Sequence, residues 1–574
     1  MLSSNKSLDN TTEEIKGKAS MNMKKIILII LCLVLSIFLI VPLAYLGVQA
    51  FSDIDGNFIG LANFSEYLKS KTMRSSFFNT LFVALTSTSI ATVLAFLYAY
   101  GLRRASVPMK WLFRAVAMLP IFAPTMLHGI GLVYLFGNKG IVTEILGINI
   151  GLYGATGIIL AQIIYIFPQI FLILDIGLST TDFRLYEVSK VLGVSKIKEF
   201  LFVTIPSIKY ALISSFFIAF TLCFTDFGAA KIVGGNFNVL AIDVYKQIVG
   251  QQNMPMGATV GILLIIPALI SFFVTQKVQK KQTSYISSKS LPYVIEKDFD
   301  RDITLTVIMS LIAGGILIVM LSVLLASLVK LWPYDLSLTL SNYSMADTLD
   351  GMKPFFNSIA VSILTALIGT VFVFIVAYLT ENTKKANKIK AISHFLSILP
   401  MALPGLVLGI SYVLFFNTES FRITDNIHLL NSFNVLYGSI FLMVFCNIVH
   451  FYSVTFITAT TAIKKIDKEI NMAAESLGVS EVSFIKNVAL PLCMPAFLEN
   501  FMYLFVNSMV TVSALIFLYT ADLKVAAISI VQFDDKGDIA RAAALSIMIV
   551  LTNIVVKILY ELFKKYILKE KYSV

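Results

Sequence analysis

Charged residues are scarce in this sequence. Asp, Glu, Lys and Arg make up only 14% of its 574 residues, while hydrophobic residues make up 57%. Ordinary soluble domains do not have this composition. Apolar runs of about eighteen or more residues recur along the chain, and each is long enough to cross a bilayer as a helix. A lipid-spanning β-barrel would instead alternate over about ten residues, so it is excluded. The composition predicts an all-α, polytopic membrane protein.

Cysteine and histidine are also rare, with four residues of each type. Cys32, Cys223, Cys446 and Cys493 lie in or beside apolar runs without metal-site spacing, so we interpret them as packing residues. The sequence has no G-x-x-x-x-G-K-[ST] motif and no polar segment long enough for a nucleotide-binding domain. We therefore expect a chain that is not an enzyme, has no catalytic or metal-binding residues and holds no cofactor of its own.

The apolar runs predict twelve membrane spans. They lie near residues 26–50, 78–101, 111–136, 153–178, 210–231, 257–276, 304–329, 356–380, 391–416, 435–458, 496–519 and 541–563. An even number places both termini on one side, and most of the 45 Lys and Arg then fall on that side, which predicts that it is cytoplasmic. The first run is longer than the core of a signal peptide. Although "VQA" at 48–50 would pass as a cleavage site, we expect an uncleaved anchor. The net charge of +11 then follows from topology and does not indicate nucleic-acid binding.

The chain contains an internal repeat. "FFNTLFVALTSTSIATVLAFLYAY" at 77–100 matches "FFNSIAVSILTALIGTVFVFIVAY" at 355–378, and "LPIFAPTMLHGIGLVYLF" at 119–136 matches "LPMALPGLVLGISYVLFF" at 399–416. Six spans in each half insert the same way up, so a pseudo-twofold axis along the membrane normal should relate the halves and place a pathway between them. The expected organisation is a polar tail (1–25), a first half (26–276), a cytoplasmic linker (277–302), a second half (303–566) and a short tail (567–574).

Two polar segments complete the repeat. Residues 187–207 read "EVSKVLGVSKIKEFLFVTIPS" and residues 472–492 read "MAAESLGVSEVSFIKNVALPL", and in both a proline follows the glycine by thirteen positions. In the first segment, Thr180 or Asp182 could cap a helix with an apolar stripe, and Gly193 would then permit a left-handed turn before a second helix. Such a unit suits a groove in another protein. The alternative is a helix that rests on lipid headgroups.

The pattern E-A-A-x-x-L-G followed by proline resembles the coupling loop in permease subunits of binding-protein-dependent ABC importers. The resemblance covers about 60–565 and implies a fused permease with the type I importer fold. Its implied partners are two cytoplasmic ABC ATPases, which bind ATP and Mg, and an extracytoplasmic solute-binding protein. It also implies a bacterial cell-membrane location and alternating access. Met472 stands where the family has Glu. The residues expected to dock the ATPases are Glu187, Val188, Ser189, Leu192, Gly193, Met472, Ala473, Ala474, Leu477 and Gly478.

Polar side chains inside spans are costly in lipid and are therefore candidates for the translocation pathway. Asp226 lies near the outer end of the fifth expected span, and the repeat places Thr511 opposite it. The expected pathway residues are Thr225, Asp226, Asn507, Ser508, Thr511 and Ser513. Asp226 could instead bond to backbone or water at a helix end. We interpret Asn447 and His450 as structural hydrogen-bonding residues, and Asp175 as a solvated residue at a helix end.

The substrate is predicted from one loop. Residues 225–253, "TDFGAAKIVGGNFNVLAIDVYKQIVGQQN", resemble the corresponding loop of fused permeases for 2-aminoethylphosphonate. Ferric-iron and thiamine permeases are fused in the same way and remain alternatives, because a carboxylate at Asp226 suits an amine and Fe³⁺ equally well. A secondary transporter driven by an ion gradient is a more remote alternative. Such transporters typically have an acidic residue in the loop between the second and third spans, and the corresponding loop here, "GLRRASVPMK" at 101–110, has none.

Overall fold

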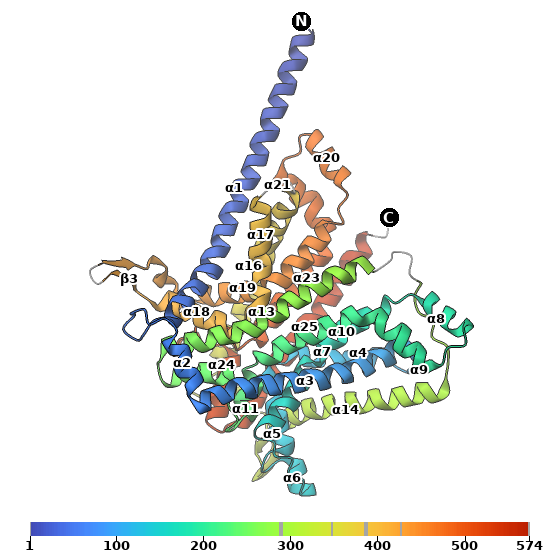
Figure 1. Cartoon of the computed structure of the whole chain (residues 1–574), viewed down its shortest axis with the longest axis vertical. Coiled ribbons are helices and arrows are strands. Elements are labelled where there is room, and N and C mark those ends of the chain that lie inside the picture. The colour runs from blue at the N-terminus through green and yellow to red at the C-terminus, as the bar shows by residue number, and fades with distance from the viewer. Residues whose placement is uncertain (1, 286–290, 346–347, 384–387, 425–426, 572–574) are drawn as a thin grey trace.

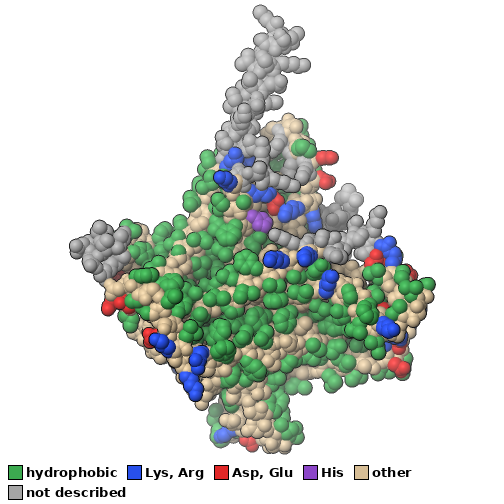
Figure 2. All heavy atoms as spheres, in the orientation of Figure 1, with side chains coloured by type: hydrophobic (Ala, Val, Ile, Leu, Met, Phe, Trp, Pro, Cys, Tyr) green, Lys and Arg blue, Asp and Glu red, His purple; other side chains and the backbone are tan. Residues whose placement is uncertain are grey.

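The computed structural model describes residues 2–285, 291–345, 348–383, 388–424 and 427–571, and it is almost entirely helical (Figure 1). Ten described helices are long and apolar enough to cross a membrane, or up to twelve if two bent pairs count as one span each. Hydrophobic side chains form a broad band over the face seen in Figure 2, with most Lys and Arg near its edges. The predicted fold class is confirmed.

The helices of the first half follow the order expected from the repeat. They are α1 (Leu2–Ala50), α2 (Ala62–Lys69), α3 (Lys71–Arg104), α4 (Lys110–Met118), η1 (Leu119–Phe122), α5 (Thr125–Phe136), α6 (Ile141–Leu146), α7 (Ala155–Ser179), α8 (Phe183–Val191), α9 (Lys196–Glu199), η2 (Phe200–Thr204), α10 (Ile205–Phe224), α11 (Gly228–Val233), α12 (Leu240–Tyr245), η3 (Lys246–Gly250) and α13 (Met254–Tyr285).

The second half repeats this order and adds two short hairpins, which the sequence analysis did not predict. Its elements are α14 (Phe299–Leu328), β1 (Val329–Leu331), β2 (Asp335–Leu338), α15 (Ser341–Ser344), α16 (Lys353–Asn382), α17 (Lys388–Ile398), η4 (Leu399–Ala402), α18 (Gly405–Asn417), β3 (Ser420–Thr424), β4 (Ile427–Leu430), η5 (Ser432–Leu436), α19 (Ile440–Ile463), α20 (Lys468–Ser476), α21 (Glu481–Phe484), η6 (Ile485–Ala489), α22 (Leu490–Leu492), α23 (Met494–Val510), α24 (Ala526–Asp535) and α25 (Ile539–Lys571). Both pairs of strands are antiparallel.

The first helix of each half packs against the other half. Helix α1 lies against α16, α17 and α18, whereas α14 lies against α3, α4 and α5. The Tyr412 hydroxyl donates to the carbonyl of Phe38 on α1 (2.6 Å), and the Ser322 hydroxyl on α14 donates to the carbonyl of Gly131 (3.1 Å). A Cβ atom at Gly131 would lie 2.7 Å from the Val319 carbonyl oxygen, so the close approach of α5 to α14 requires glycine. Because the first helix of each half packs against the other half, the two halves are interlocked.

Two predicted spans are broken. The third expected span divides into α4, η1 and α5, and the ninth into α17, η4 and α18, where the two parts are bent by 109°. The residue before a proline avoids helical dihedrals. Ala123 before Pro124 (φ −107°, ψ 140°) and Leu403 before Pro404 (φ −107°, ψ 123°) are accordingly extended. Apolar composition predicted the spans but not these breaks.

Other predicted boundaries differ from the structure. Helix α10 ends at Phe224 and α23 at Val510, so the last residues of the expected spans 210–231 and 496–519 lie outside these helices. Helix α1 begins at Leu2 and includes most of the predicted polar tail. The predicted linker 277–302 is also partly helical, because α13 extends to Tyr285 and α14 begins at Phe299. Hydropathy shows which residues are apolar enough to lie in lipid, and a helix can continue past the end of such an apolar run.

Candidate functional site

The first polar segment forms a helix–turn–helix, which we call unit 1 (residues 182–199). Asp182 begins it by accepting a hydrogen bond from the Arg184 backbone N–H (3.1 Å), as expected for a helix cap. Helix α8 ends before Gly193, which has a φ of +65°, and α9 follows Ser195. The predicted left-handed turn is therefore present.

The second polar segment forms unit 2 (residues 467–484) with the same geometry. Helix α20 ends before Gly478, which has a φ of +68°, and Ser480 caps α21 by accepting a hydrogen bond from Ser483 N–H (3.3 Å). A short π-helix follows each unit at the equivalent position, η2 after unit 1 and η6 after unit 2. Figure 1 shows α8 and α20 on the side of the bundle away from α6 and β3. We call that side the turn end.

Most of the predicted docking residues are exposed at the turn end. The exposed ones are Glu187, Val188, Leu192, Gly193, Met472, Ala473, Leu477 and Gly478, and Ala474 is half-buried. Leu192 and Leu477, the residues before the two glycines, are 73% and 80% exposed. Large apolar side chains so exposed on polar helices indicate an interaction surface. Ser189 does not share this surface, because it is buried and its hydroxyl donates to the Tyr186 carbonyl (2.9 Å) and to the Glu199 carboxylate.

A buried arginine holds unit 1 to the helix bundle. The Arg104 guanidinium, at the end of α3, donates to the hydroxyls of Thr181 (2.5 Å) and Tyr186 (3.2 Å) and to the Leu178 carbonyl (3.3 Å). Arg104 is only 2% exposed. The sequence analysis missed this residue, and the repeat does not reveal it, because the equivalent residue of the second half is Asn382, whose amide donates to the Tyr378 carbonyl of its own helix.

Replacing Arg104 with Met is expected to lower uptake about three- to tenfold, because hydrogen bonds to a charged group stabilise by about 1.5–3 kcal/mol. Unit 1 should also become easier to cleave with trypsin at Lys190 and Lys196. Arg114→Met is the matched control, since Arg114 is more exposed and its ion pair with Asp175 (3.2 Å) duplicates one made by Arg103. Unchanged uptake and cleavage in Arg104→Met would contradict an anchoring role.

The interpretation of Asp175 as a solvated residue is wrong. Its side chain is 9% exposed, and its carboxylate accepts hydrogen bonds from Arg103 (2.5 and 2.6 Å) and Arg114 (3.2 Å). These arginines lie on α3 and α4, which the chain brings beside α7. Only the packing of the three helices reveals the ion pairs.

Asp226 lies between α10 and α11. Its carboxylate accepts hydrogen bonds from the backbone N–H groups of Gly228 and Ala229, both at 3.2 Å, and it is 8% exposed. The side chains of Gln162 and Thr125 lie beside it. Thr225 ends α10, where its hydroxyl donates to the Thr221 carbonyl (2.9 Å). Asp226 therefore makes the backbone bonds expected of a helix-end residue.

The predicted pathway residues of the second half occupy the equivalent break. Ser508 accepts a hydrogen bond from the Asn447 amide (2.7 Å), while the Asn507 amide donates to the Tyr503 carbonyl (2.8 Å). Thr511 follows the end of α23 and is 8% exposed. The Ser513 hydroxyl and the His450 ring flank the backbone at Gly405. The hydrogen bond expected for Asn447 is confirmed, whereas Nδ1 of His450 has no partner among the described residues.

The sequence analysis missed several polar residues beside this group. Tyr165 on α7 lies within electrostatic range of Asp226 and also of Tyr503, which belongs to the other half. Gln162 and Asn447 are separated by the same 285 residues as Gly193 and Gly478, and so are Tyr165 and His450. Extending the repeat to individual polar residues would have found them. The described residues contain no group of three or more His, Cys, Asp or Glu arranged for a metal ion.

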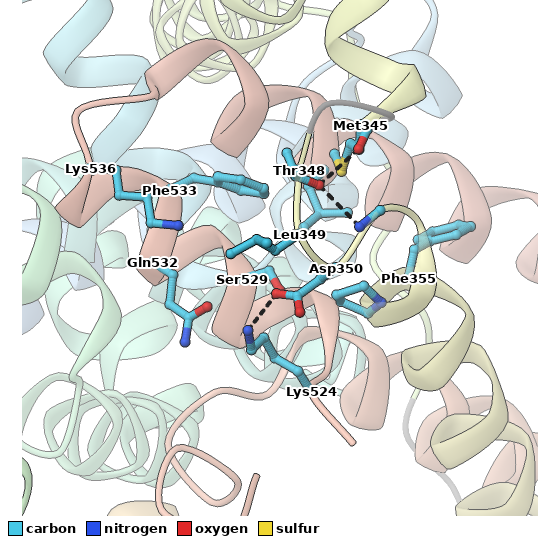
Figure 3. Close-up of a pocket in the computed structure, with 13 residues that line it drawn as sticks. Met345, Thr348, Leu349, Asp350, Phe355, Lys524, Ser529, Gln532, Phe533 and Lys536 are labelled. Carbon is cyan, nitrogen blue, oxygen red and sulfur yellow. Dashed lines mark hydrogen bonds and ion pairs between the residues drawn. The ribbon is translucent and has the colours of Figure 1, made fainter. Parts of the chain in front are cut away.

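At the end opposite the turn end, an ion pair joins the halves. Lys231 of α11 lies 2.8 Å from Asp535 of α24. A pocket borders the same helix α24 (Figure 3). In the close-up, Lys524 and Asp350 point toward each other across its lower side, and their charged groups are 2.5 Å apart. None of the predicted pathway residues lines this pocket.

Residues 91–284 and 383–569 each match the family described as "Binding-protein-dependent transport system inner membrane component". The chain belongs to this family. The two matched ranges contain units 1 and 2 respectively, so a single chain carries the permease domain twice. It is a fused permease subunit of an ABC importer, which implies an ATPase and a solute-binding protein as partners. Its relatives are transport subunits and not enzymes, and the family is located in the inner membrane.

Curated relatives extend over most of the permease. It is 28% identical to the "Putative ferric transport system permease protein FbpB 1" of Haemophilus influenzae, over 89% of this chain and 80% of that protein. It is 29% identical to the "Ferric transport system permease protein FbpB" of Actinobacillus pleuropneumoniae, over 82% and 69%. A "Sulfate transport system permease protein CysW" of Synechococcus elongatus is 26% identical over 36% of this chain and 70% of its own length. These names favour the ferric alternative and do not support the phosphonate prediction.

Proposed function

We propose that this permease imports ferric iron. The observation that carries the proposal is similarity along nearly the whole chain to two permeases named for ferric transport. The site is chemically compatible, since Asp226 and the nearby Tyr165 offer the hard oxygen atoms that suit a small, highly charged cation. The sulfate permease resembles a much smaller part of this chain.

Units 1 and 2 are the proposed docking sites for two copies of a cytoplasmic ABC ATPase, which binds ATP and Mg. This assignment places the turn end and both termini in the cytoplasm. The support is that both units have a left-handed glycine at the same place and an exposed leucine before it. A solute-binding protein would deliver the ion to the opposite end, where Lys231 and Asp535 join the halves.

The proposed cycle is alternating access. ATP binding would draw units 1 and 2 together with the ATPases, and the halves would separate at the opposite end. The ion would then pass between the halves, along Thr225, Asp226, Asn507, Ser508, Thr511 and Ser513. ATP hydrolysis would return the permease to the state in which Lys231 and Asp535 are paired.

Uptake by cells with and without this chain tests the substrate, with their own ATPase and binding protein present. Labelled ferric iron, 2-aminoethylphosphonate and sulfate should be offered separately. We expect deletion to remove ferric uptake alone. Loss of sulfate or phosphonate uptake with ferric uptake intact would contradict the ferric assignment and leave the importer class unaffected.

A further inference from the structure

The linker between the halves lies directly against unit 1. The Phe183 backbone N–H at the start of α8 donates to the Leu291 carbonyl (3.0 Å). Lys190 of α8 forms an ion pair with Glu296 (2.8 Å), and Lys196 of α9 forms one with Asp298. The lysines lower the pKa values of both carboxyl groups below their usual range. Residues 291–298 thus contact both helices of unit 1 immediately before α14 begins.

An aromatic contact adds to these ion pairs. The ring of Tyr293 packs edge-on against Phe183 (5.3 Å between centroids) and Tyr186 (5.0 Å). The Arg104 guanidinium lies 3.9 Å from the centre of the same ring, within the range of a cation–π interaction. The linker therefore shares with unit 1 the buried arginine that holds the unit to α3.

Unit 2 is held at the same place by a different part of the chain. Lys24 of α1 lies 2.7 Å from the carboxylate of Glu481, the first residue of α21, and the Tyr378 hydroxyl donates to that carboxylate (2.6 Å). Lys196 and Glu481 each stand three residues after the glycine of their unit. In unit 1 this position is paired with the residue just before α14, and in unit 2 it is paired with a residue inside α1, the first helix of the other half.

The two pairings have opposite polarity. Unit 1 presents Lys196 to an acidic partner, whereas unit 2 presents Glu481 to a basic partner. If the two partners were exchanged, Lys24 would face Lys196 and Asp298 would face Glu481. Like charges at these positions would repel. The charge that each unit presents is therefore complementary to that of the partner that it contacts in this structure.

We propose that residues 291–298 position unit 1 for its ATPase, so that the linker acts as a brace and not merely as a tether between the halves. Lys24 provides the equivalent brace on unit 2. The proposal rests on the docking role proposed for the units. A tether requires only an intact chain, whereas a brace requires the contacts of Lys190, Tyr293, Glu296 and Asp298.

Two changes to the full-length protein separate a brace from a tether. In the first, a specific protease site is placed between residues 285 and 291 and is cut after assembly in the membrane. We expect uptake to be retained, because residues 291–298 stay attached to α14 and to unit 1. In the second, Tyr293→Ala, Glu296→Gln and Asp298→Asn are combined in an uncut chain, and uptake is expected to fall about fivefold. The opposite pattern would overturn the proposal.

A charge exchange guards against misfolding of the triple variant. Lys190 and Glu296 are 69% and 65% exposed, so Lys190→Glu is expected to lower uptake only about two- to threefold, and Lys190→Glu with Glu296→Lys should restore it. Lys557→Glu is the control, because Lys557 also forms a solvent-exposed ion pair, with Glu561 within α25. A double variant no better than Lys190→Glu would contradict the brace.

Co-purification of the ATPase distinguishes this proposal from the docking role itself. With the linker contacts removed, the ATPase should remain bound through unit 2 while uptake falls. If a permease with an intact linker retains its ATPase after the exposed surfaces of both units are altered, the docking role fails. If docking holds and the triple variant transports normally, only the brace is wrong.

Discussion

With valine at both Gly193 and Gly478, ATP-driven uptake should fall at least tenfold while the permease remains in the membrane. Both glycines have left-handed φ values, +65° and +68°. An L-residue there costs about 1–2 kcal/mol, and a β-branched side chain is a more severe outlier. A Cβ at either position would meet no atom within 4 Å, so the effect comes from backbone strain and not from a clash. In the valine variant, the strained turn should relax to another backbone conformation, which would change the angle between the two helices of each unit.

Asparagine at the same two positions is the matched control, because asparagine tolerates the left-handed region. We expect the asparagine variant to transport at close to the normal rate and to keep its ATPase on co-purification. The valine variant should lose both properties. If the valine and asparagine variants transport equally well, the geometry of the turn does not matter for docking, and the proposed role of units 1 and 2 is wrong.

Replacing Asp226 with Asn is expected to reduce ferric uptake about tenfold or more. The asparagine amide oxygen can still accept one of the two backbone hydrogen bonds that Asp226 accepts, so the fold around α11 should survive. The change removes the negative charge that we propose attracts the ion. A tenfold loss corresponds to about 1.4 kcal/mol. This is a modest energy for the attraction between a trivalent cation and the carboxylate of a residue that is only 8% exposed.

The comparison with alanine shows whether charge or capping matters. Asp226→Ala removes both, and it leaves the N–H groups of Gly228 and Ala229 without the carboxylate that now accepts from them. Membrane level, thermal unfolding and uptake should be measured for each variant. If Asp226→Asn transports normally and only Asp226→Ala is impaired, Asp226 is a cap and the ion passes elsewhere. Thr511→Val, at the equivalent position, should have little effect on stability.

The two units were predicted well because their geometry is local. A glycine directly after an amphipathic helix favours a left-handed turn through backbone energetics alone. Gly193 and Gly478 therefore adopt the expected conformation. Binding of ATPases by these units remains a prediction.

Span boundaries were predicted less well, because hydropathy reports compatibility with lipid and not helical continuity. Pro124 and Pro404 break two spans that are largely apolar, and α10 ends just before Asp226 although the expected span continues to residue 231. The prolines were visible in the sequence, but Pro168 and Pro267 lie inside continuous helices, so a proline by itself does not locate a break.

By itself, the sequence determined the membrane class, the repeat, the fused organisation and the geometry of the two units, because each follows from composition or from interactions between near neighbours. Only the tertiary structure decided which distant groups meet. It placed Arg104 beneath unit 1, paired Asp175 with two arginines, exchanged α1 and α14 between the halves and laid residues 291–298 along α8 and α9. These contacts depend on how helices far apart in the chain pack, and periodicity within a single segment carries no information about that packing.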